Sequence, residues 1–107
     1  MAVDLDSFVD SALKQFSAHG YVPAFFMQMR TRLGTKEAIE RLVVSGEMQS
    51  GIQRLKRLNL LDLSIEATVL RFPEIFRHDI QEAAKFRLAQ VGWKAPAIHK
   101  SSRKRTR

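Results

Sequence analysis

The sequence predicts an all-α protein: a single compact bundle of five to six short helices, followed by a disordered basic C-terminal tail. Two observations predict this fold. Apolar residues recur at every third or fourth position along most of the chain, and glycines follow these segments, where a left-handed helix end favours glycine. The chain has 107 residues, an ordinary size for one domain. We therefore expect a helical domain over residues 1–92 and the tail over 93–107.

The first half of the chain predicts three helices. The first, over residues 5–18, carries an apolar stripe with a spacing of three and four. The second covers 22–33, and Pro23 fits its first turn, where no amide donor is lost. The third is expected to begin at Thr35, as its N-cap, and to end at residue 46.

The second half predicts three further segments. Residues 48–58 have apolar side chains on one side and polar or basic ones on the other. Asp62 is expected to cap a segment that ends near Arg71. This segment is rich in β-branched residues, so a strand is the alternative; we favour a helix because a single strand would have no partner. A last helix covers residues 79–91, after a short turn at 72–76.

The net charge of +7 is concentrated at the C-terminal end. Six of the 18 basic residues lie in 93–107, which contains no acidic residue, so residues 1–92 carry a net charge of only +1. Basic clusters bind phosphate backbones through counterion release and carry no information about base sequence. The expected nucleic-acid-binding residues of the tail are Lys94, Lys100, Arg103, Lys104, Arg105 and Arg107.

A second basic group lies in the helix expected over 48–58. Arg54, Lys56 and Arg57 occupy the polar side of "IQRLKRL" and complete the expected nucleic-acid surface. Two interpretations are open: a solvated basic face on a packing helix, or the second helix of a helix-turn-helix. The second is weak, because Leu42 is bulky where the helices must cross closely and the charges fall late in the helix. We expect no base-sequence preference.

Four segments carry a resemblance to known proteins. In order they are "GYVPAFFMQM", "LGTKEAIERLV", "SGIQRLKRLNLLDLSIEATVLRFPEIF" and "AAKFRLAQVG". Together they resemble a widespread uncharacterised family of small bacterial all-helical proteins and protein segments, over about residues 20–92. The resemblance implies a helical fold and a bacterial or phage origin. It implies no activity, because the family has no settled one.

Few patterns indicate catalysis. The absence of cysteine excludes disulfides and cysteine-ligated zinc, and the three histidines lie far apart in the sequence. We find neither a glycine-rich phosphate loop nor a serine in a nucleophile elbow. Arg71 and His78 have a spacing similar to the signature of the HEPN ribonuclease superfamily, but Pro73 interrupts the helix that this signature needs. We expect no enzymatic activity, no cofactor and no metal site.

These observations favour a small non-enzymatic protein, bacterial or phage-type, that binds nucleic acid or a nucleoprotein complex mainly through backbone electrostatics. The alternative is a protein-interaction module, such as an inhibitor or accessory subunit of a bacterial defence complex. Its docking surface would be the apolar side chains of Phe25, Phe26 and Met29. The acidic N-terminus is unlike a secretory signal, and the longest apolar segment is too short for a membrane span. We expect a cytoplasmic protein with no membrane partner, and the oligomeric state stays open.

Overall fold

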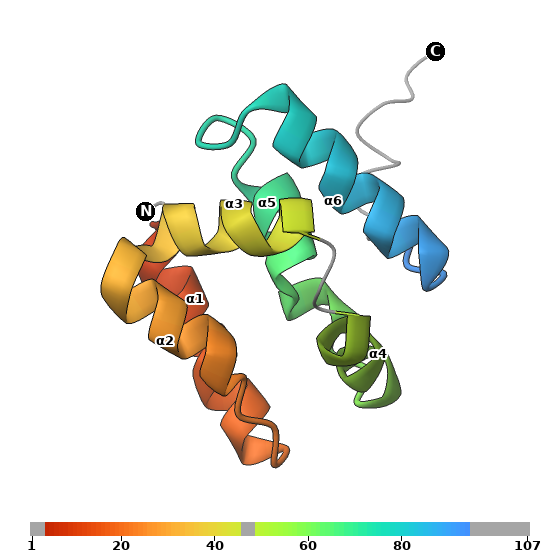
Figure 1. Cartoon of the computed structure of the whole chain (residues 1–107). Coiled ribbons are helices and arrows are strands. Elements are labelled where there is room, and N and C mark those ends of the chain that lie inside the picture. The colour runs from red at the N-terminus through yellow and green to blue at the C-terminus, as the bar shows by residue number, and fades with distance from the viewer. Residues whose placement is uncertain (1–3, 46–48, 95–107) are drawn as a thin grey trace.

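The computed structural model describes residues 4–45 and 49–94. Within these residues the chain forms six α-helices and one short 3-10 helix, with no strand, which confirms the all-α prediction (Figure 1). The segment for which a strand was the alternative is helical. The elements are α1 (Leu5–Ala18), α2 (Ala24–Leu33), α3 (Thr35–Ser45), α4 (Gln49–Arg57), η1 (Leu61–Leu63), α5 (Ile65–Arg71) and α6 (His78–Gln90).

Helix α3 lies across the middle of the fold, with α1 and α2 on one side and α5 and α6 on the other (Figure 1). Its buried face, which includes Ile39, Leu42 and Val43, belongs to the main hydrophobic cluster. That cluster also contains residues from α1, α2, α5 and α6. Each buried aliphatic side chain contributes about 1.5–3 kcal/mol, so the packing around α3 is a major source of stability.

Two predicted helix caps are wrong. Thr35 is the first residue of α3 rather than its cap, because the Gly34 carbonyl already accepts the amide of Ala38 at 3.0 Å. The N-cap of α5 is Ser64, whose hydroxyl accepts the amide of Ala67 at 3.0 Å, instead of Asp62. Pro23 likewise precedes α2 rather than lying in its first turn. In the first two cases the predicted cap has a partner elsewhere in the fold.

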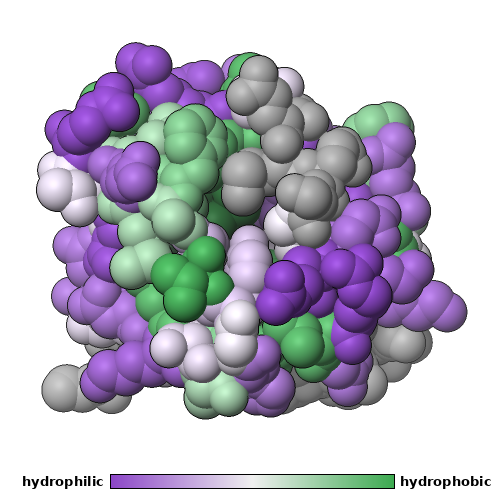
Figure 2. Space-filling view, turned by 60° about the horizontal axis from the view of Figure 1, so that its bottom comes forward, coloured by the Kyte–Doolittle hydropathy of each residue, from purple (hydrophilic) through white to green (hydrophobic). Residues whose placement is uncertain are grey.

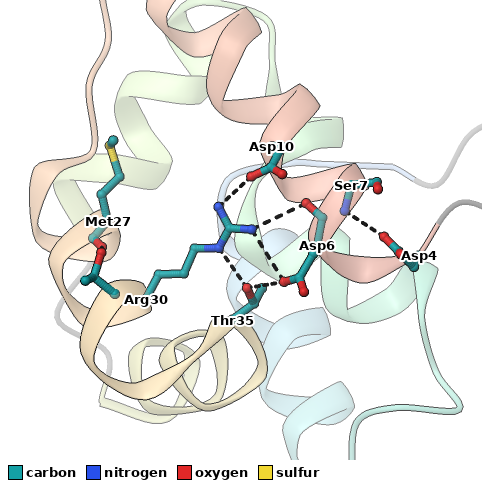
Figure 3. A network of polar contacts seen from close by, with 8 residues as sticks. Asp4, Asp6, Ser7, Asp10, Met27, Arg30 and Thr35 are labelled. Atoms are coloured by element: carbon teal, nitrogen blue, oxygen red, sulfur yellow. Dashed lines mark hydrogen bonds and ion pairs between the residues drawn. The ribbon is translucent and has the colours of Figure 1, made fainter.

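The hydroxyl of Thr35 belongs to a polar network that joins α1, α2 and α3 (Figure 3). Arg30 lies at its centre. The Arg30 guanidinium donates from Nε to Thr35 and from Nη1 to Asp10, both at 2.7 Å, while Thr35 donates to Asp6. Because both aspartates are open to solvent, the ion pairs contribute about 0–1 kcal/mol each. The network fixes how α1 lies on α2 and α3. Its two aspartates also neutralise the positive charge of Arg30.

The chain turns back onto the bundle after α6. Gly92 has φ +79°, and the amide of Trp93 donates to the Leu88 carbonyl at 3.0 Å, as in a glycine-terminated helix end. The indole of Trp93 packs on the cluster that contains Ile52 of α4, and its Nε1 donates to Asp62 at 2.7 Å. Trp93 is therefore packed against the helical domain, and the basic tail starts beside α4. Residues 95–107 lie outside the described part of the chain.

Candidate nucleic-acid interface

Helix α4 has one buried side and one exposed basic side. Ile52 packs in a cluster with residues of α5 and α6, and Leu55 packs in another with Phe16 of α1. The opposite side carries Arg54, Lys56 and Arg57, all exposed. The apolar anchors therefore direct the basic residues outward, as the alternation in "IQRLKRL" predicts.

The packing of α4 bears on the helix-turn-helix interpretation. In that motif the recognition helix packs against the helix before it, which here is α3. The clusters that hold Ile52 and Leu55 contain residues of α1, α5 and α6 and no residue of α3. Residues 46–48, which include the predicted turn at Gly46 and the predicted start of the fourth helix, lie outside the described residues. The anchoring favours the other interpretation, a packing helix with a basic outer face.

Lys56 and Arg57 have no carboxylate within ion-pair distance among the described residues. Acidic side chains pair instead with Arg30, Lys36, Arg41, Arg77, Lys85 and Arg87. Apart from Arg54 on the same helix, the other described cations without such a pair are scattered over separate parts of the chain: Lys14, Arg32, Arg71 and Lys94. Lys56 and Arg57 are adjacent in one helix, so their charges act together on an anionic partner.

Arg54 differs from these two residues. Its guanidinium carbon lies 5.4 Å from the centroid of the Tyr21 ring, and its Nη2 donates to the Gly20 carbonyl at 3.3 Å. Burial raises the pKa of the Tyr21 phenol, and the positive charge of Arg54 opposes part of this rise. Arg54 thus ties α4 to the turn between α1 and α2. Of the three predicted residues on α4, it is the one with a structural contact.

The remaining predicted contact residues are placed as follows. Lys94 is exposed and follows the packed Trp93. The other basic residues of the tail lie outside the described part of the chain: Lys100, Arg103, Lys104, Arg105 and Arg107.

The predicted apolar docking surface on α2 is not one surface. Phe25 is 52 % exposed, whereas Phe26 and Met29 are only 3 % and 9 % exposed and belong to the main core. Phe25 and Phe26 point about 100° apart on α2, and only Phe26 points into the core. The prediction is corrected for Phe26 and Met29. Val44 at the end of α3, which is 65 % exposed, is the other large apolar residue near Phe25.

The sequence-based prediction missed a buried ion pair between α5 and α6. Arg87 Nε donates to Glu66 Oε2 at 2.7 Å, and their side chains are only 7 % and 1 % exposed. Arg87 Nη2 is also buried, and it has no hydrogen-bond partner within residues 4–45 and 49–94. The signal was present: Glu66 interrupts the apolar stretch "SIEATVL", and Arg87 interrupts "FRLAQV". Buried charges of this kind are tolerated only when paired.

The ribonuclease-like spacing is divided between two helices. Arg71 is the last residue of α5 and lies over the ring of Phe8 at 4.9 Å, while His78 is the first residue of α6 and lies 3.6 Å from Glu82. Over residues 4–45 and 49–94 there is no group of three or more metal-ligating side chains. None of the helices described is long and apolar enough to cross a bilayer.

Figure 2 shows the face formed by the lower ends of α2 and α4 in Figure 1. Hydrophobic side chains gather to the left of a central hollow, and strongly hydrophilic side chains lie to its right (Figure 2). The apolar and the strongly hydrophilic side chains of this face therefore lie mainly on different sides of the hollow. Comparisons with family models, curated proteins and solved structures found no match to this chain, so the resemblance over 20–92 stays a prediction.

Proposed function

We propose that this protein binds nucleic acid through its phosphate backbone, without catalysis. The binding surface consists of the outer face of α4, chiefly Lys56 and Arg57, together with the basic tail from Lys94 onward. The observation that carries the proposal is the pair of adjacent cations on α4 that no described carboxylate neutralises. Trp93 supports it, because its packing next to Ile52 makes the tail begin beside the same helix.

The packing of α4 also bears on specificity. Base reading from a helix usually depends on the side chains of its first turns, seated in the major groove. The basic residues of α4, Arg54, Lys56 and Arg57, all lie in its last turn instead. Contacts to phosphates alone give no discrimination between base pairs. We therefore propose binding that is independent of base sequence.

A charge-neutralising double variant tests the role of α4. Lys56→Gln/Arg57→Gln should reduce affinity for a fluorescent duplex about tenfold and make the slope of log K against log salt shallower by about two units. The free energy of unfolding should stay the same, because neither side chain contacts the core. Fluorescence anisotropy measures the binding. Arg54 is left intact, because its loss would also release Tyr21.

The matched control removes the same charge elsewhere. Lys36→Gln/Lys85→Gln replaces two exposed lysines that are already paired with Glu40 and Glu82. This control should change affinity less than threefold, because the wild-type lysines are already screened by their carboxylates. Equal losses in the two double variants would show that only net charge matters, and would remove α4 from the interface.

A further inference from the structure

The basic helix α4 lies between two aromatic side chains. Tyr21, which follows α1, packs on the cluster that contains Leu55. Trp93, which follows α6, packs on the cluster that contains Ile52. In Figure 1 the α1–α2 turn and the C-terminal end of α6 accordingly lie on two sides of α4. Both rings are half-buried, so each rests partly on its apolar cluster and partly contacts solvent.

The open surface of the Trp93 indole is suited to stacking. The only hydrogen-bond donor of the ring, Nε1–H, is used by Asp62 at 2.7 Å, and this bond holds the ring in one orientation. What remains open is the π surface, on which any base can stack because every base has a π face. The carboxylate of Asp62 repels phosphate, so this position favours a base over the nucleic-acid backbone.

On the other side of α4, a guanidinium group offers a second plane. The guanidinium carbon of Arg54 lies 5.4 Å from the centroid of the Tyr21 ring, and Nη2 donates to the Gly20 carbonyl at 3.3 Å. Arg54 is exposed, so its guanidinium is also accessible from solvent. Guanidinium planes stack on unpaired bases as aromatic rings do. Because the fold already holds Arg54 in place, binding would cost little side-chain entropy.

These two planes have no use on a duplex, whose bases stack on one another and leave the phosphates as the main contacts. In a single strand the bases can turn outward onto aromatic and guanidinium planes. We propose, on the basis of the function proposed above, that the preferred ligand is a single-stranded nucleic acid. Lys56 and Arg57 hold its phosphates, and its bases stack on Trp93 and Arg54. Stacking contributes about tenfold in affinity per base, without selecting among the bases.

The fluorescence of Trp93 tests the proposal directly, because Trp93 is the only tryptophan of the chain. The full chain is titrated at one salt concentration with a mixed-sequence single strand, with the abasic strand of the same length and with the duplex. The single strand should quench the emission of Trp93 and bind about a hundredfold more tightly than the abasic strand, since two bases stack. The abasic strand and the duplex should bind through their phosphates and leave the emission nearly unchanged.

Two substitutions of Trp93 form a matched pair. Trp93→Leu and Trp93→Phe both lose the hydrogen bond to Asp62, but only phenylalanine keeps a ring. Trp93→Leu should reduce the preference for the single strand over the abasic strand about tenfold, whereas Trp93→Phe should keep most of it. Arg54→Lys keeps the charge without the plane and should reduce the same preference about tenfold. Circular dichroism checks that the three variants are folded.

The outcomes separate this proposal from the function on which it rests. Equal affinity for the single strand and the abasic strand, with no quenching, would overturn the stacking and leave the backbone binding intact. An equal preference in Trp93→Leu and Trp93→Phe would also overturn the stacking on Trp93. If none of the three ligands bound even at about 50 mM salt, both proposals would fail.

Discussion

Replacing Glu66 by glutamine should lower the free energy of unfolding by about 3 kcal/mol, a large part of the total for a domain of this size. The reason is the buried guanidinium of Arg87, which would keep its positive charge after losing its counter-charge. Among the described residues its Nη2 has no hydrogen-bond partner, so no other acceptor in that part of the chain would replace the carboxylate. Urea denaturation followed by circular dichroism measures the change.

Glu37→Gln is the matched control for this substitution. Glu37 also accepts from an arginine Nε, at 3.1 Å, but both partners are exposed and the variant should lose less than about 1 kcal/mol. The double variant Glu66→Leu/Arg87→Met should recover most of the loss, because an apolar pair of similar volume carries no buried charge. If Glu66→Gln cost no more than Glu37→Gln, the pair would not be buried and isolated from water as described.

Ending the chain at Lys94 should weaken binding to duplex DNA by about a hundredfold at 50 mM salt, since about three phosphate contacts would be lost. The five basic residues removed are Lys100, Arg103, Lys104, Arg105 and Arg107. The remaining binding, through α4 and Lys94, should show a salt slope near −2. Fluorescence anisotropy at several salt concentrations measures both quantities.

Two truncations distinguish loss of charge from loss of fold. The chain that ends at Lys94 keeps the hydrogen bond from Trp93 to Asp62 and should unfold like the full chain. The chain that ends at Gly92 loses this bond and the packed indole, and should be less stable by about 1–2 kcal/mol. If the truncation at Lys94 bound DNA as tightly as the full chain, the tail would not be part of the interface.

The helices could be predicted because their signals are local. The stripe of α1 and the glycine ends depend on residues within a few positions of one another. The two wrong caps depended on distant residues. Thr35 bonds to Asp6 of α1, and Asp62 bonds to Trp93 after α6, so neither side chain was available at its own helix start. No spacing in the sequence places those partners.

The candidate surfaces were predictable only where their signals are also local in the sequence. The alternation in "IQRLKRL" correctly places three basic residues on the exposed side of α4. It could not separate Arg54 from its neighbours, because that difference comes from Tyr21, 33 positions earlier in the chain. On α2, apolar residues surround the helix, so the pattern defines no single face. Packing in the main hydrophobic cluster, which draws on several helices, decides that Phe26 is buried and Phe25 is exposed.

The salt dependence of DNA binding by the full chain tests the central claim most directly. Affinity for a duplex without a designed site should be measured between about 50 and 200 mM salt. With about four to six phosphates neutralised, log K should fall against log salt with a slope near −4 to −5, a loss of about 200- to 1,000-fold over this range. Duplexes of unrelated sequence should give the same values. A slope near zero, or no binding at 50 mM salt, would contradict the proposed phosphate-backbone interface.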